Sequence, residues 1–172
     1  MSMEAKILMI IASNNFRDEE YLQPKQILEH AGAKITTASS SIGSITGMLG
    51  ATAQATVTID DADSNNYDAV IFVGGTGASE YFKNKRAHEI AKQTFDSGKI
   101  IAAICIAPST LANAGILEGK SATSYPSEQS NLESKGARYT GEPVTRDSNV
   151  ITGKGPEAAT LFGNEIVSAL SE

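Results

Sequence analysis

Cysteine is nearly absent from this chain of 172 residues, which has one thiol, Cys105. A single cysteine cannot form an intrachain disulfide, so the sequence predicts a reducing compartment, and we expect the cytoplasm. Histidine is almost as scarce, with His30 and His88 only. Both fall in predicted helices far in sequence from Cys105, so we expect them to be surface or packing residues.

Long apolar runs and clusters of basic residues are missing as well. The first apolar stretch, which begins at Ile7, covers only about seven residues, too few to span a bilayer. Because a charged segment follows it, we interpret it as a first strand and not as a signal peptide. The net charge is −6 with no cluster of Lys or Arg, which argues against nucleic acid or an anionic membrane as a partner.

The remaining composition is ordinary for a soluble globular protein, with 41% hydrophobic and 20% charged residues. The length predicts one domain over residues 1–172. Short apolar runs alternate with amphipathic stretches: we predict strands at 6–13, 33–40, 67–75 and 99–105, and helices at 24–32, 79–98, 107–115 and 155–172. The segment 47–60 alternates more and is predicted to form a surface β-ribbon. Strands apolar on both faces and separated by helices are typical of a parallel sheet in an α/β layer fold.

Cys105 lies at the junction of a predicted strand and a predicted helix, at the sheet edge where open parallel sheets bind ligands. Ala103 and Ala107 flank it at two residues on either side, as the crowded turn of a nucleophile elbow requires. Pro108 suits the first helical turn. A helix N-terminus would lower the pKa of the thiol and favour a reactive thiolate. An inert, buried thiol is the alternative, and the pattern alone leaves both open.

Two other features fall at the same edge. The pair Gly74–Gly75 ends a buried strand, and its amides could hold an oxyanion, although a tight loop without a ligand is an equal interpretation. Asp18, Glu19 and Glu20 lie together at a predicted helix start. We expect at least two of them to be solvated partners of the helix dipole. One turned inward toward the thiol would have a raised pKa and could share a proton with it.

These motifs resemble those of the PfpI/DJ-one superfamily over nearly the whole chain. The matching segments, in the family's order and spacing, are DEEYLQP, AVIFVGGTG, IAAICIAPSTLANAG, SATSYPSEQSNLESKGARY and NVITGKGPEAATLF. The resemblance implies a flavodoxin-like three-layer α/β sandwich with a mostly parallel central sheet and a nucleophile elbow. It also implies a homodimer or larger homo-oligomer, and no metal or organic cofactor.

Carried over by position, the resemblance implies Cys105 as the elbow nucleophile. It implies Glu20, four residues before Pro24, as the carboxyl that hydrogen-bonds the thiol. The oxyanion and substrate pocket would consist of Gly74, Gly75, Ile106, Tyr125, Gly155 and Pro156. Of these, Gly75 and Ile106 match the positions whose amides form the oxyanion pocket.

The chain departs from the family at three places. Ile106 stands where protease-like members have histidine after the cysteine, and Tyr125 stands where the DJ-one branch has a histidine. A peptidase needs a base to activate its thiol, so we expect little peptidase activity. Glu80 lies near a glutamate that PfpI-like oligomers use between subunits, but its loop is one residue longer.

The resemblance implies a cysteine-dependent enzyme that acts on small aldehydes or glycated substrates in stress protection, like glutathione-independent glyoxalases and deglycases. The thiolate would add to an aldehyde such as methylglyoxal, and Glu20 would move a proton between adjacent carbons. Two alternatives stay open. One is a PfpI-type intracellular cysteine peptidase, and the other is a non-enzymatic redox sensor or chaperone whose Cys105 oxidises to sulfinic acid.

Overall fold

Seven strands form the central sheet of the computed structural model, which describes residues 4–172. The strand order is β10-β11-β7-β6-β1-β2-β5; β10 pairs antiparallel with β11, and the other neighbouring strands are parallel. The bounds are β1 Lys6–Ile10, β2 Lys34–Ser39, β5 Val57–Thr58, β6 Ala69–Phe72, β7 Ile100–Ile104, β10 Val144–Asp147 and β11 Val150–Gly153. This mostly parallel sheet confirms the predicted α/β class.

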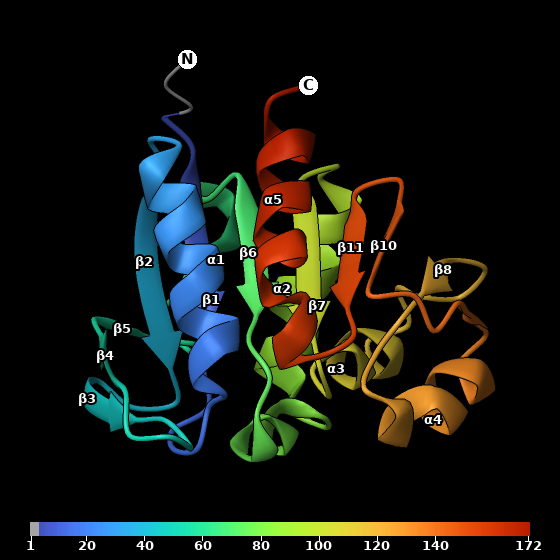
Figure 1. The fold of residues 1–172 in the computed structure, drawn as a ribbon, viewed down its shortest axis with the longest axis horizontal. Coiled ribbons are helices and arrows are strands. Elements are labelled where there is room, and N and C mark those ends of the chain that lie inside the picture. The colour runs from blue at the N-terminus through green and yellow to red at the C-terminus, as the bar shows by residue number, and fades with distance from the viewer. Residues whose placement is uncertain (1–3) are drawn as a thin grey trace.

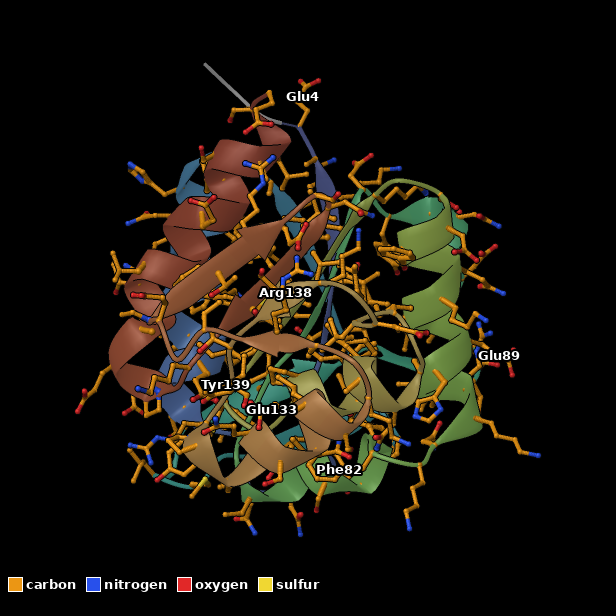
Figure 2. The ribbon with its side chains drawn as sticks, turned by 90° about the vertical axis from the view of Figure 1, so that its right-hand side faces the viewer. Glu4, Phe82, Glu89, Glu133, Arg138 and Tyr139 are labelled. Atoms are coloured by element: carbon orange, nitrogen blue, oxygen red, sulfur yellow. The ribbon has the colours of Figure 1, made fainter. Side chains whose placement is uncertain are left out.

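Helices cover both faces of the sheet and complete a three-layer sandwich. In Figure 1, α1 (Asp18–His30, blue) and α5 (Ala159–Leu170, red) lie side by side in front of the strands. Figure 2 shows α5 and α2 (Lys85–Asp96) on opposite sides of the sheet, and α3 (Pro108–Asn113) packs on the side of α2. Because side chains alternate along a strand, Ile7 and Met9 of β1 face the core under α1 and α5, while Leu8 and Ile10 face the core on the other side.

The smaller elements lie around the carboxyl edge and the end of the sheet. The hairpin of β3 (Gly43–Thr46) and β4 (Thr52–Ala55) precedes β5, and β8 (Ser121–Ala122) pairs with β9 (Arg138–Tyr139) near α4 (Gln129–Ser134). The turns Ser64–Asn66, Thr76–Tyr81, Pro126–Glu128 and Pro156–Ala158 are 3-10 helices. The predicted ribbon at 47–60 is displaced, because its tip lies at 47–51 and β5 joins the main sheet beside β2. Within residues 4–172, no helix is both long and apolar enough to cross a membrane.

Two predicted helices differ from the structure. The helix predicted from Pro24 begins at Asp18, with Pro24 in its interior. Pro24 is buried, and its Cα lies 3.1 Å from the position that a Cβ on Gly163 of α5 would take, so α1 and α5 pack closely at the interior proline. The helix predicted over 79–98 is divided, because Asn84 caps α2 by accepting a hydrogen bond from the Ala87 N–H at 2.9 Å.

Candidate active site

Cys105 occupies the turn between β7 and α3 with a strained backbone. Its φ of 67° lies in the left-handed region, which residues other than glycine rarely adopt. The turn is held from both sides, since the Cys105 N–H donates to the Gly153 carbonyl at 3.0 Å and its carbonyl accepts from the Tyr125 N–H at 2.8 Å. The geometry is that of a nucleophile elbow, with the thiol residue 8% exposed.

Glu20 comes from the first turn of α1 and is fully buried beneath Cys105. A Cβ on Gly74 would collide with Glu20 Oε1 and would lie 2.5 Å from Cys105 Cβ, so only glycine lets the carboxyl and the thiol approach each other here. Neither carboxyl oxygen of Glu20 makes a hydrogen bond of normal geometry to any residue in 4–172. The nearest polar groups are the Cys105 side chain and the Gly74 backbone. A carboxyl in such a place favours its neutral form.

Burial dominates the proton affinity of both groups. Desolvation raises the pKa of Glu20 to about 8, against the effects of the Cys105 thiol and of the positive charge of Arg17. Desolvation and the Glu20 charge also raise the pKa of Cys105, although the N–H groups of Gly75 and Ile106 lower it. The predicted raised pKa of an inward carboxyl is therefore confirmed.

The predicted lowering of the thiol pKa by a helix N-terminus is wrong. The helix α3 has six residues, and its dipole does not offset the loss of solvent around Cys105. Because two adjacent negative charges repel strongly in a buried site, Cys105 and Glu20 carry at most one negative charge between them near neutral pH.

The N–H groups of Gly75 and Ile106 are directed at the Cys105 side chain. The Arg17 N–H donates to the Gly74 carbonyl at 2.9 Å. Since the carbonyl and the following N–H of a trans peptide point in opposite directions, this bond turns the Gly75 N–H toward the thiol. Two backbone donors at one point can stabilise an oxyanion.

A cleft of about 990 Å³ opens above Cys105. Five of the predicted pocket residues line it: Gly75, Ile106, Tyr125, Gly155 and Pro156. Gly74 and Glu20 instead lie under the floor of the cleft. The volume is in the range of small-molecule sites.

Residues 5–169 of the chain match the family described as the DJ-1/PfpI family. The chain belongs to the DJ-1/PfpI family. It is 41% identical over 171 residues to an uncharacterised protein of Methanocaldococcus jannaschii, covering 98% of this chain and 83% of that protein. It is 30% identical to a deglycase of Pyrococcus abyssi, over 95% of this chain and 98% of that one. A ThiJ/PfpI domain protein from Brachyspira murdochii has the same fold, with a TM-score of 0.94, 34% identity and 96% of both chains covered. The predicted flavodoxin-like architecture of the DJ-1/PfpI family is thus confirmed.

Most other residues that line the cleft of this DJ-1/PfpI protein were not predicted from the sequence, and among them are Arg17, Met48 and Lys154. Met48 comes from the tip of the β3–β4 hairpin, where its sulfur accepts a hydrogen bond from the Thr76 N–H at 3.5 Å. Arg17 directly precedes the acidic run, but no local pattern shows that its side chain turns to the cleft. Arg17 and Met48 reach the site only through the tertiary fold, whereas Lys154 is the direct neighbour of the predicted Gly155.

The acidic run divides into three different roles. Asp18 is 6% exposed and accepts hydrogen bonds from the N–H groups of Leu49 at 2.9 Å and Ala51 at 2.8 Å. It therefore anchors the hairpin tip that places Met48 at the cleft. Glu19 is half-exposed and forms two bonds of 2.9 Å with the Arg17 guanidinium. The expectation that at least two of the three are solvated is wrong, because the hairpin contact buries Asp18 and Glu20 is buried as well.

The other predicted polar residues lie away from the thiol. Glu80 is exposed and accepts hydrogen bonds from Ser13 and Ser40 of its own chain. His30 is exposed at the end of α1, and His88 bonds a backbone carbonyl at 2.8 Å, so neither histidine lines the cleft. Within residues 4–172, no group of three or more His, Cys, Asp and Glu side chains is placed to hold a metal ion.

Proposed function

We propose that this DJ-1/PfpI protein is an enzyme that uses Cys105 as nucleophile and Glu20 as proton carrier on small reactive aldehydes or their glycation adducts. The observation that carries the proposal is the buried Glu20 carboxyl against a strained Cys105, with the N–H groups of Gly75 and Ile106 directed at the same sulfur. The name of the Pyrococcus abyssi relative, a deglycase, supports this class of substrate.

The reactive state is the pair with one negative charge and one proton. With methylglyoxal, the Cys105 thiolate adds to the aldehyde carbon, and the new oxyanion forms opposite the Gly75 and Ile106 N–H groups. The Glu20 carboxyl protonates this oxygen and becomes a carboxylate. A hemithioacetal results, in which the former aldehyde carbon keeps its hydrogen.

Glu20 then moves a proton between the two adjacent carbons. Its carboxylate removes the hydrogen from the former aldehyde carbon and returns a proton to the former ketone carbon, while the hydroxyl proton passes to the neighbouring oxygen. The product is a thioester of lactate on Cys105. Water attacks the thioester carbonyl, its hydroxyl forms the acid, its other proton passes to the Glu20 carboxylate, and Cys105 leaves as the thiolate. The starting pair is restored, and the net reaction adds one water to methylglyoxal and gives lactic acid.

Peptide hydrolysis fits this site less well. A cysteine peptidase uses a base, itself oriented by a third group, to activate the thiol and protonate the leaving amine. Neither His30 nor His88 lines the cleft. We therefore expect casein and peptide amides to be cleaved barely, if at all.

We also propose a cytoplasmic homodimer or larger homo-oligomer. The single thiol supports a reducing compartment. Large apolar side chains are exposed near the cleft, with Leu49 66% and Leu161 56% exposed, and such side chains support a contact between copies. Size-exclusion chromatography with light scattering would test the assembly: a mass of two or more chains supports it, and a single chain contradicts it.

The function is tested by mixing purified protein with methylglyoxal in the absence of glutathione and following both aldehyde loss and lactate formation. Wild type should form lactate and Cys105→Ser should not. The same proteins are assayed with casein, where robust cleavage that Cys105→Ser abolishes would favour the peptidase. If wild type forms no lactate but peroxide readily converts Cys105 to sulfinic acid, the redox-sensor alternative would replace our proposal.

A further inference from the structure

Arg17 is the cation most closely tied to the Cys105–Glu20 pair. Its backbone N–H holds the Gly74 carbonyl, and its side chain lines the cleft above Cys105. The guanidinium donates two hydrogen bonds of 2.9 Å each to the Glu19 carboxylate. Such a two-point contact restricts the orientation of an arginine side chain and holds its charge in one place.

A negative charge on the buried pair would be stabilised by a positive charge nearby. One negative charge must be carried by a thiol that is 8% exposed and a carboxyl that is 0% exposed. In many cysteine enzymes a neighbouring histidinium stabilises the thiolate. Here no histidine lines the cleft, and the chain has only His30 and His88.

We propose that Arg17, held by Glu19, is a positioning residue whose positive charge keeps the Cys105–Glu20 pair in its singly negative, reactive state. This inference depends on Cys105 as the reactive group but not on an aldehyde as its substrate. Arg17 supplies the positive charge that a histidinium supplies in other cysteine enzymes. Unlike histidine, it stays protonated throughout the physiological pH range.

Several ionisable groups besides the pair itself line the cleft above Cys105: Arg17 ahead of α1, Tyr125 after β8, and Lys154 and Glu157 on either side of the Gly155–Pro156 turn. The Glu19 carboxylate, which pairs with Arg17, acts in the opposite direction and raises the pKa of Glu20. Lys154 bonds the Gly141 carbonyl at 3.2 Å and is the rival source of positive charge. Arg17 is favoured because it is the N-cap residue of the helix that carries Glu20 and its backbone N–H donates to the Gly74 carbonyl at 2.9 Å. Its positive charge also lowers the pKa of Glu20.

The test is the pH dependence of Cys105 alkylation by iodoacetamide, which needs no substrate. Arg17→Gln should raise the pH at which alkylation reaches half its maximal rate by about half to one unit, which is the low end for a lost opposite charge because the side chain is partly exposed and paired. At neutral pH, alkylation should slow by about three- to tenfold. Arg17→Lys keeps the charge and should restore most of the wild-type profile.

Two controls separate charge from structure. Lys25→Gln removes a cation from the same helix, where Lys25 pairs with Glu29, and should leave the profile unchanged. In wild type, high salt should raise the pH at which alkylation reaches half its maximal rate, because the Arg17 side chain is 29% exposed and salt screens its charge. Arg17→Gln should lose this salt response, and the salt series in wild type decides the matter if that variant fails to fold.

Three results would overturn the proposal. An Arg17→Gln profile identical to wild type would show that the charge does not reach the pair. If alkylation slows equally in Arg17→Lys and Arg17→Gln, the shape of arginine matters and its charge does not. A shift in Lys154→Gln without one in Arg17→Gln would assign the charge to Lys154. Because alkylation is measured without substrate, failure to turn over methylglyoxal would leave this proposal standing, and the reverse also holds.

Discussion

Replacing Glu20 with glutamine should stabilise the protein while it removes the proton carrier. Glu20 is fully buried, and its carboxyl oxygens make no hydrogen bond of normal geometry to residues in 4–172. Glutamine has nearly the same shape and stays neutral at every pH. The variant therefore isolates the cost of ionising a carboxyl in this position.

The magnitude follows from the pKa of Glu20, which burial raises from 4.5 to about 8. Below about pH 4.5 the carboxyl is protonated in both the folded and the unfolded chain, and its burial costs no ionisation energy. Between about pH 4.5 and 8 the unfolded chain releases the proton and the folded protein keeps it, so the free energy of unfolding falls as pH rises. With about 1.4 kcal/mol for each pH unit, the loss reaches about 3 kcal/mol at pH 7.

Thermal unfolding of wild type, Glu20→Gln and Glu29→Gln at about pH 5 and pH 7 measures this effect. For a domain of this size, about 3 kcal/mol corresponds to a Tm difference of about 6–12 °C. Glu20→Gln should have the higher Tm, by a small margin at the lower pH and a large one at the higher pH. Glu29→Gln, on the exposed face of the same helix, should follow wild type. If Glu20→Gln is no more stable than wild type at the higher pH, the carboxyl is not held neutral by burial, and its assignment as proton carrier fails.

Two other substitutions test the framework around the pair. Gly74→Ala places a Cβ against Glu20 Oε1 and Cys105 Cβ, so we expect a loss of about 1–3 kcal/mol in unfolding free energy by denaturant titration and the loss of activity; wild-type activity in a folded variant would show that the contact is not tight. Asp18→Ala removes the acceptor of two backbone N–H groups at the hairpin tip, so we expect a loss of about 2–4 kcal/mol in the same titration; a loss below about 0.5 kcal/mol, as for a solvated charge, would contradict the anchoring role.

The strand-to-helix junctions were predicted well from local sequence. Ala103 and Ala107 indicate the crowded turn around Cys105, and the glycine pair marks the end of β6, because both signals depend on residues adjacent in the chain. The antiparallel hairpin of β10 and β11 was not predicted. Its outer strand is short, polar and half-buried along its length, so it has neither a continuous apolar run nor a clean alternation.

The properties that depend on distant contacts could not be predicted. Asp18 looks like a helix-dipole partner, and only the hairpin tip 31–33 residues away shows that it is an anchor. The pKa of Cys105 was predicted from the local helix start, but burial under the assembled cleft moves it in the opposite direction. Arg17 becomes relevant only when α1, β6 and β7 are brought together.

The most direct test of the central claim compares lactate formation from methylglyoxal by Glu20→Gln and by wild type, without glutathione. Because glutamine keeps the shape but carries no transferable proton, lactate formation should fall by about 100-fold or more, while Cys105 is still alkylated and the protein stays folded. Glu29→Gln, which alters an exposed carboxylate on the same helix that pairs with Lys25, should stay within a few-fold of wild type. Lactate formation by Glu20→Gln at close to the wild-type rate would show that Glu20 does not carry the proton.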